Sequence, residues 1–278
     1  MAKPFVAVVT GASSGIGQAI AIEFAMRGAS LILNCRRNLH GLTDTVSQIQ
    51  ALLEPQGANP SSVQQDLLAV VSNIDDANSN RALADAAFER HGYVDVWIHS
   101  AGADVLTGDA RGLSFSEKLA KLWATDIQGT FVLSRMVADK MLSQPKIDDR
   151  LPSMVHIGWD QAEHGMEGDS GQFFSATKAA IAAFSKSLAK SVAPHIRVNC
   201  IAPGWIQTEW GQKASSAWQQ RATGESMLGR WGTAQDIARV VAAVSFEDGA
   251  FINGQTIAVN GGWQGIPHAA KCDTNLDT

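Results

Sequence analysis

The chain has 278 residues with 27 acidic and 22 basic side chains, and its formal net charge is -5. This mildly acidic balance lacks the basic clusters that nucleic acid requires, so we expect no nucleic-acid partner. The three cysteines, Cys35, Cys200 and Cys272, form no Cys-x-x-Cys pair, which predicts neither a disulfide framework nor a metal site. No signal-peptide or membrane-spanning pattern is found, so we expect a cytoplasmic location and no membrane partner.

The first predicted element is a strand that leads into a glycine-rich turn. Residues 5–9 form an unbroken apolar run, typical of a strand buried on both faces of a parallel sheet. Three glycines follow in the spacing Gly-x-x-x-Gly-x-Gly, and then a helical apolar pattern begins. Backbone N–H groups at such a helix start bind phosphate, and the missing side chains let the anion come close. The predicted phosphate cradle consists of Gly11, Ser13, Ser14, Gly15, Ile16 and Gly17. The alternative is a glycine turn with no ligand.

This spacing, with Thr10 before the first glycine, resembles the Thr-Gly-x-x-x-Gly-x-Gly motif of the short-chain dehydrogenase/reductase family. Further segments match the family in order as far as Gly262. The resemblance implies one α/β domain over residues 1–263 and a tail over 264–278. The expected fold is a Rossmann-type, doubly wound parallel sheet of about seven strands with helices on both faces. Within the family, the 3-oxoacyl-reductase-like branch is the nearest in pattern.

A second strand over residues 31–33 ends at Arg36 and Arg37. In a doubly wound sheet this end lies beside the adenosine ribose, where an acid binds the 2′-hydroxyl and an arginine accommodates a 2′-phosphate. Since two arginines and no acid are present, we predict NADP(H) rather than NAD(H) as the cofactor. The alternative is that both arginines are solvated surface charges.

The remaining cofactor residues follow from the family resemblance. A third strand is expected to end near Asp66 and Leu67, which the resemblance places against the adenine. The fourth strand ends in His99, Ser100, Ala101 and Gly102, where the family has Asn-Asn-Ala-Gly; the last three are expected beside the ribose. We expect His99 to pack or hydrogen-bond inside the sheet. The segment expected to close over the nicotinamide contains Pro203, Gly204, Ile206 and Thr208.

Two long helices are predicted in the second half, over residues 119–141 and 175–192. In the family, the first of these pairs with its counterpart in a second subunit. The resemblance therefore implies a homodimer or homotetramer.

The catalytic group of the family is altered. Active members use a tyrosine as proton donor, a lysine four positions later that lowers the tyrosine pKa and binds the ribose, a serine and an asparagine. The lysine is present as Lys178, but Phe174 stands at the tyrosine position and has no hydroxyl. Trp159 stands at or near the serine position and Asp126 at the asparagine position. Three of the four positions therefore differ from the family pattern.

A replacement acid is one hypothesis for this site. Residues 158–169 are rich in titratable groups, and Asp160 and His164 are the best placed by sequence. The alternatives are a solvated acidic loop and, for Asp126 with Lys178, a simple charge pair. The chain's single tyrosine, Tyr93, precedes the fourth strand and is expected at the opposite edge of the sheet.

Three functions fit this pattern. The first is an NADP(H)-binding carbonyl or alcohol oxidoreductase that acts on a small molecule with altered or weak catalysis. The second is a non-catalytic NADP(H)-binding sensor, scaffold or partner subunit. The third is a lyase or isomerase on the same fold. Aromatic residues, including Trp205 and Trp218, suggest either a substrate pocket or packing.

Overall fold

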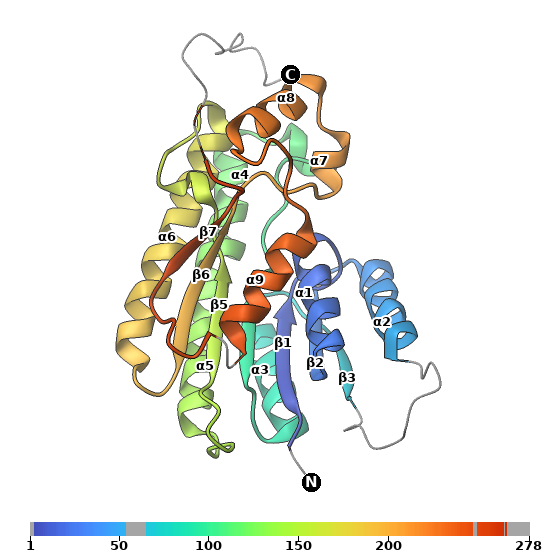
Figure 1. Ribbon diagram of the computed structural model, residues 1–278, viewed down its shortest axis with the longest axis vertical. Coiled ribbons are helices and arrows are strands. Elements are labelled where there is room, and N and C mark those ends of the chain that lie inside the picture. The colour runs from blue at the N-terminus through green and yellow to red at the C-terminus, as the bar shows by residue number, and fades with distance from the viewer. Residues whose placement is uncertain (1–2, 54–64, 247–248, 264, 266–278) are drawn as a thin grey trace.

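The computed structural model describes residues 3–53, 65–246, 249–263 and 265 (Figure 1). Within them, seven parallel strands form one sheet in the order β3-β2-β1-β4-β5-β6-β7. The order reverses direction at β1, which makes the carboxyl end of β1 the topological switch point. The predicted doubly wound sheet is confirmed. Segment 54–64, the end of the chain beyond 265 and Cys272 lie outside the described residues.

The strands follow the apolar runs of the sequence. Their bounds are β1 Phe5–Thr10, β2 Ala29–Cys35, β3 Leu67–Val71, β4 Val96–His99, β5 Ser153–Ile157, β6 Arg197–Pro203 and β7 Thr256–Val259. The inner strands are buried on both faces, as parallel sheets covered by helices require. The edge strands β3 and β7 are only partly buried.

The expected end of the third strand is wrong. Strand β3 begins at Leu67 and ends at Val71, because the apolar run Leu67–Val71 pairs with residues 31–35 of β2. Asp66 therefore lies at the amino end of the strand. There its carboxylate contacts Arg90 Nε at 2.5 Å and His91 Nε2 at 3.3 Å, at the end of α3. Asp66 and Leu67 thus lie at the edge of the sheet opposite the glycine turn. The prediction that they contact the adenine depended on their being at the carboxyl end of the strand, which the structure contradicts.

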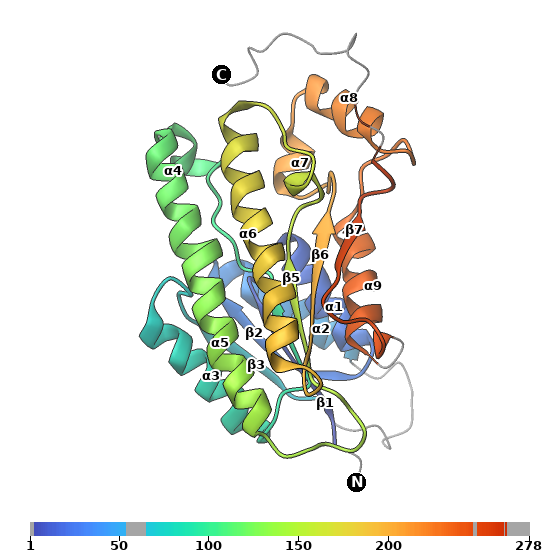
Figure 2. The same ribbon diagram turned by 90° about the vertical axis from the view of Figure 1, so that its left-hand side faces the viewer.

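Helices cover both faces of the sheet (Figures 1 and 2). One face carries α1 Gly15–Met26, α2 Leu39–Leu53 and α9 Ala234–Ser245, and the other carries α3 Ala77–His91, α5 Thr130–Ser143 and α6 Gly168–Val192. Strand β1 contributes side chains to both hydrophobic cores. Ala7 and Val9 pack on the side of α1, α2 and α9, whereas Val6 and Val8 pack on the side of α3, α5 and α6. The short helices α7 Glu209–Lys213 and α8 Ser216–Glu225 lie beyond the carboxyl ends of the strands (Figure 1).

The helix predicted over residues 119–141 is longer and is interrupted. It begins as α4 Phe115–Leu122 with a capping box between Ser114 and Glu117, and continues into α5 through a π-helical segment, Trp123–Gly129. Such segments are rare and frequently occur at functional sites. Asp126 lies inside this segment. The second predicted helix, α6, begins at Gly168 rather than at residue 175.

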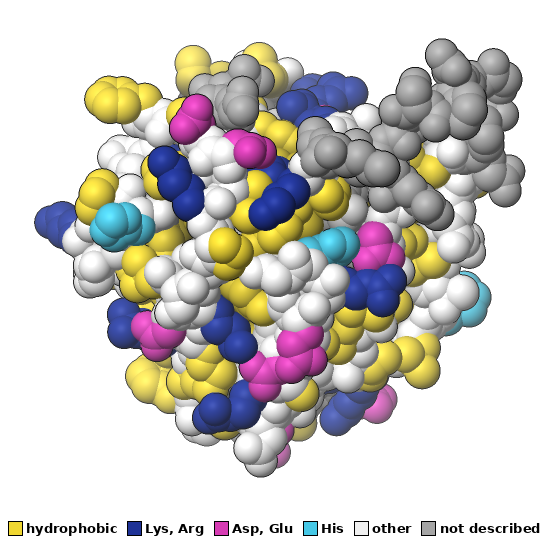
Figure 3. All heavy atoms as spheres, turned by 90° about the horizontal axis from the view of Figure 1, so that it is seen from below, with side chains coloured by type: hydrophobic (Ala, Val, Ile, Leu, Met, Phe, Trp, Pro, Cys, Tyr) yellow, Lys and Arg dark blue, Asp and Glu magenta, His cyan; other side chains and the backbone are white. Residues whose placement is uncertain are grey.

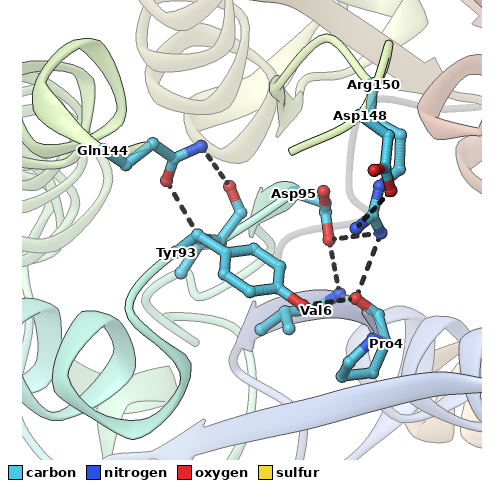
Figure 4. Close-up of polar contacts among 8 residues, drawn as sticks. Pro4, Val6, Tyr93, Asp95, Gln144, Asp148 and Arg150 are labelled. Carbon is cyan, nitrogen blue, oxygen red and sulfur yellow. Dashed lines mark hydrogen bonds and ion pairs between the residues drawn. The ribbon is translucent and has the colours of Figure 1, made fainter. Parts of the chain in front are cut away.

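The amino edge of the sheet carries its own polar cluster, as Figure 4 shows. Tyr93 Oη donates to Pro4 O at 2.7 Å, and Arg150 Nη1 donates to Pro4 O and to Asp95 Oδ2, each at 3.1 Å. Burial raises the pKa of Asp95 to about 6. Seen from below, this end of the molecule carries acidic and basic side chains interspersed (Figure 3). The expectation that Tyr93 lies away from the candidate site is confirmed.

Within the described residues, no helix has the length and apolar character needed to cross a membrane.

Candidate functional site

The glycine turn packs directly against the end of β4. A Cβ on Gly11, whose φ is +68°, would lie 2.8 Å from Ala101 Cα, and one on Gly17 would lie 2.2 Å from Gly11 O. Thr10 Oγ1 accepts hydrogen bonds from the backbone N–H groups of Ser100 and Ala101 at 3.1 and 3.2 Å. The close approach of these two segments therefore requires glycine and brings the predicted ribose residues beside the predicted phosphate cradle.

The N-terminus of α1 is open to an anion. Its N-cap residue, Ser14, makes no side-chain capping hydrogen bond, so the first N–H groups of the helix lack that partner. A Cβ on Gly15 (φ +55°) would meet only Thr208 Cγ2, at 3.7 Å. The cradle and Thr208 of the predicted nicotinamide segment therefore lie close together. These residues fit a dinucleotide whose pyrophosphate lies at the start of α1.

The adenosine end of the site differs from the prediction in one residue pair. The carboxyl end of β3 leads into Ser72, whose N–H donates to Cys35 O at 3.0 Å and whose hydroxyl accepts from Asn34 Nδ2 at 2.8 Å. Ser72 and its neighbour Asn73 therefore lie at the carboxyl end of β3, where the sequence pattern predicted Asp66 and Leu67. The β-branched end of the run, Val70 and Val71, was the signal for this later strand end.

The two arginines after β2 are both exposed, but their surroundings differ. Arg36 Nη1 lies 3.5 Å from Asp75 Oδ2. No ion pair of Arg37 occurs among the described residues. Both side chains lie next to the predicted ribose position, at the end of the strand that neighbours β1.

Lys178 and Asp126 form a close ion pair. Lys178 Nζ donates to Asp126 Oδ2 at 2.9 Å and to Ile157 O at 3.4 Å, and the backbone N–H of Ala103 donates to Asp126 Oδ1 at 2.7 Å. The Asp126 side chain is 2% exposed and that of Lys178 16%. Three elements therefore meet here: α6, the end of β5 and the π-helical segment.

Aromatic rings occupy positions 159 and 174, where the family pattern has the serine and tyrosine hydroxyls. The rings of Trp159 and Phe174 meet edge to face with centroids 6.3 Å apart. Phe174 also contacts the buried ring of Phe173 at 5.0 Å and packs against a small apolar cluster with Val105 and Leu122. The indole N–H of Trp159 is the one hydrogen-bond donor that this ring pair offers.

The two candidate acids, Asp160 and His164, differ in burial and in their contacts. Asp160 is 6% exposed; its Oδ2 accepts from Asn260 Nδ2 at 3.0 Å, and its Oδ1 has no hydrogen-bond partner among the described residues. Burial raises the pKa of Asp160 to about 6. A Cβ on Gly204 would lie 3.2 Å from Asp160 Oδ2, so this carboxyl borders the predicted nicotinamide segment. His164 is exposed and stacks on Trp263 at 4.1 Å.

A buried charge cluster holds α8 over this end of the sheet. Glu225 accepts from Trp205 Nε1 at 2.6 Å, Arg221 Nε at 2.9 Å and Gln161 Nε2 at 3.3 Å. The Arg221 guanidinium lies over the rings of Trp205 and Trp218, which also contact each other. Trp205 therefore packs against Trp218 and Arg221 of α8, beside the charge cluster. The glutamine and tryptophan partners of Glu225 come from other segments of the chain, 64 and 20 positions away, so local sequence patterns do not predict this cluster.

Sequence reasoning also missed a histidine pair beneath the site. His99 and His156 are register partners on β4 and β5, and their rings stack with centroids 4.7 Å apart. Ser134 Oγ of α5 lies 3.1 Å from His99 Nε2 and 2.9 Å from His156 Nε2, and Ser185 Oγ of α6 lies 3.0 Å from His156 Nδ1. Burial holds the pKa of both histidines below the usual value. The expected structural role of His99 is confirmed.

A parallel sheet with an open glycine turn at its switch point is typical of the dinucleotide-binding Rossmann fold. A family model described as enoyl-(acyl carrier protein) reductase matches residues 11–264. The chain belongs to the short-chain dehydrogenase/reductase family, an oxidoreductase family. Among curated relatives, 3-oxoacyl-(acyl-carrier-protein) reductase FabG of Escherichia coli is 32% identical over 260 residues, which cover 92% of this chain and 96% of the relative.

Solved structures show the same fold. A short-chain dehydrogenase from Burkholderia cenocepacia in complex with NADP has a TM-score of 0.78 at 24% identity and covers 94% of this chain and 98% of its own. A 3-oxoacyl-(acyl-carrier protein) reductase from Brucella melitensis in complex with NAD has a TM-score of 0.79 at 24% identity, covering 94% and 97%. Among the residues described here, no group of three or more His, Cys, Asp or Glu side chains could hold a metal ion.

Proposed function

We propose that this protein binds NADP(H) and acts on a small carbonyl or alcohol substrate with altered or weak catalysis. The observation that carries the proposal is the combination of an open phosphate cradle with the Lys178–Asp126 pair beside Phe174. The nicotinamide, when bound, gives or takes a hydride. In this proposal the phosphate cradle binds the cofactor and the Lys178–Asp126 pair orients it. The tyrosine hydroxyl that donates a proton in active family members has no counterpart at Phe174.

Each part of the chain has a distinct task in this proposal. The N–H groups at the start of α1, from Gly15 to Gly17, bind the pyrophosphate. Lys178 holds the nicotinamide ribose with the N–H that it does not give to Asp126 or Ile157. The segment from Pro203 to Thr208 lines the nicotinamide, and the rings of Trp159 and Phe174 exclude water from the reacting carbon.

We propose Asp160 rather than His164 as the proton source. A buried carboxyl with a pKa of about 6 is partly protonated near neutral pH and has the ionisation range that general acid catalysis needs. The Oδ1 atom without a partner supports this role, and so does the position beside Gly204. His164 faces Trp263 instead. General acid catalysis contributes on the order of 10²–10⁴ in rate, so Asp160→Asn is expected to reduce turnover by that order.

We propose a preference for NADP(H) over NAD(H). Arg37 supports it, because its guanidinium is exposed at the predicted ribose position without an ion pair within the described residues. Arg36 is partly neutralised by Asp75, so we assign Arg37 the larger share of the 2′-phosphate contact.

We further propose a cytoplasmic homodimer or homotetramer. Exposed apolar side chains on α4 and the π-helical segment support self-association, since Phe115 is 37% exposed and Trp123 58%. Sedimentation of the purified protein tests this directly: a monomer at micromolar concentration contradicts it.

A non-catalytic NADP(H)-binding protein is the second candidate. It is favoured by the ring pair of Trp159 and Phe174, which presents hydrocarbon where the family has two hydroxyls. In this function the protein senses the cofactor or serves as a partner subunit of an active relative.

Two measurements test the proposal. Quenching of tryptophan fluorescence by NADPH measures binding, and a panel of ketones and secondary alcohols measures turnover in parent, Asp160→Asn and His164→Gln. We expect NADPH binding in all three proteins and turnover that falls only in Asp160→Asn. Absence of NADPH binding contradicts both functions, whereas binding without any turnover supports the non-catalytic one.

A further inference from the structure

The environment of Asp126 differs from that of an ordinary surface charge pair. Its carboxylate is 2% exposed, and both oxygens are engaged, Oδ1 by the N–H of Ala103 at 2.7 Å and Oδ2 by Lys178 Nζ at 2.9 Å. Because the π-helical segment Trp123–Gly129 carries it, Asp126 faces the end of α6 that bears the candidate site. The ammonium group of Lys178 is therefore in direct contact with the Asp126 carboxylate.

Phe174 and Lys178 share one face of α6, because they are four residues apart. Lys178 reaches Ile157 O at the end of β5, and the Phe174 ring meets Trp159 two residues further on. Ring and ammonium thus approach the same strand end. A phenylalanine has no group that ionises, so a nearby carboxylate costs it nothing electrostatically.

We propose that Asp126 is a positioning residue that fixes Lys178 through its charge and that this charge makes position 174 unsuitable for an ionisable phenol. Phe174 and Asp126 are then coupled substitutions, and restoring the hydroxyl alone does not rebuild a proton donor. The inference rests on the proposed function in placing the site, but its electrostatic content can be measured without cofactor or substrate.

The expected size follows from Coulomb's law. In general, a like charge within about 4–6 Å disfavours ionisation of a titratable group by about 1 to 3 pKa units. Lys178 alone would favour the phenolate, and Asp126 offsets that effect. Removing only the negative charge should therefore lower the pKa of a phenol at this position.

Ultraviolet titration of two variants tests the coupling. Phe174→Tyr introduces a second phenol into a chain whose single tyrosine, Tyr93, is buried with a raised pKa, and the parent protein supplies the baseline. We expect the pKa of the introduced phenol to be lower by about 1 to 2 units in Phe174→Tyr/Asp126→Asn than in Phe174→Tyr. Phe174→Tyr/Asp139→Asn is the matched control, because Asp139 is an exposed aspartate on α5, and no shift is expected there.

Equal phenol pKa values in Phe174→Tyr and Phe174→Tyr/Asp126→Asn overturn the inference. Phe174→Tyr/Asp126→Ser is a second neutral variant in case the asparagine variant does not fold. NADPH binding is measured separately in each protein. A phenol shift without NADPH binding supports the inference and contradicts the proposed function, whereas NADPH binding without a shift does the reverse. With a ketone and NADPH, we expect at least about tenfold more turnover in the double variant than in Phe174→Tyr.

Discussion

Replacing Asp160 by asparagine should stabilise the protein at neutral pH. The side chain is 6% exposed, and its Oδ2 accepts a hydrogen bond from Asn260 Nδ2 at 3.0 Å, but burial outweighs the interactions that favour the ionised form. Asparagine has the same shape and keeps an oxygen that accepts this hydrogen bond. The substitution therefore removes a buried negative charge and leaves the packing in place.

The size and the sign of the expected change in the free energy of unfolding follow from the pKa shift of Asp160. Burial raises the pKa of Asp160 from 3.8 to about 6, so the unfolded chain ionises first and folding favours the protonated carboxyl. Stability from this group is greatest below pH 3.8, falls as the pH rises toward about 6, and is constant above that. A difference of about 2 units corresponds to about 3 kcal/mol, which is the most that Asp160→Asn can gain near neutral pH.

Urea unfolding followed by tryptophan fluorescence measures this gain in parent and variant at two pH values. We expect a higher midpoint for Asp160→Asn near neutral pH and nearly equal midpoints near pH 4. Asp236→Asn is the matched control with the opposite sign, because the Arg230 guanidinium lowers the pKa of Asp236 to about 2. Comparing each variant with the parent at the same pH cancels the contribution of Asp95. A gain that is the same at both pH values refutes the reasoning.

Three further predictions concern the cofactor and the core. Gly15→Ala should weaken NADPH binding at least about tenfold in a fluorescence titration, whereas Gly28→Ala, also at positive φ but with nothing within 4 Å of its Cβ, should leave binding unchanged. Arg37→Ala should reduce the preference for NADPH over NADH by about tenfold to a hundredfold; equal losses for both cofactors contradict its assigned role. Ser134→Ala should lower the free energy of unfolding by about 1–3 kcal/mol because two buried imidazoles lose their hydroxyl, and Ser143→Ala, which alters only an exposed bond to its own helix, should change it far less.

The fold was predictable where local pattern and burial agree. The inner strands are apolar on both faces and the glycine turn has a unique spacing, so the sequence alone places the sheet and its switch point. Strand β3 was misplaced because it is an edge strand, only partly buried, and its apolar run Leu67–Val71 follows directly on the polar residues taken for its end. The π-helical segment at Trp123–Gly129 also gave no local signal, because the residue that binds its Asp126 lies 52 positions away in Lys178.

The candidate site was predictable in its residue types and less so in its contacts. The sequence identified Lys178, Asp126 and Asp160 as candidates, but the partner of Asp160 is Asn260, 100 positions further on. The pairing of His99 with His156 depends on the register of β4 against β5, which sequence spacing does not specify. Long-range contacts thus decide which titratable groups are buried and which, such as His164, are exposed.

The altered positions of the site compensate one another physically. Lys178 is 16% exposed, and an unpaired ammonium there would be costly, yet Asp126 supplies the opposite charge at 2.9 Å. The ring of Trp159 likewise packs edge to face against that of Phe174, so each of these two large side chains has a partner. Because both the charges and the rings are paired, we expect Phe174→Tyr alone to gain less turnover than Phe174→Tyr/Asp126→Asn, which a ketone assay with NADPH measures.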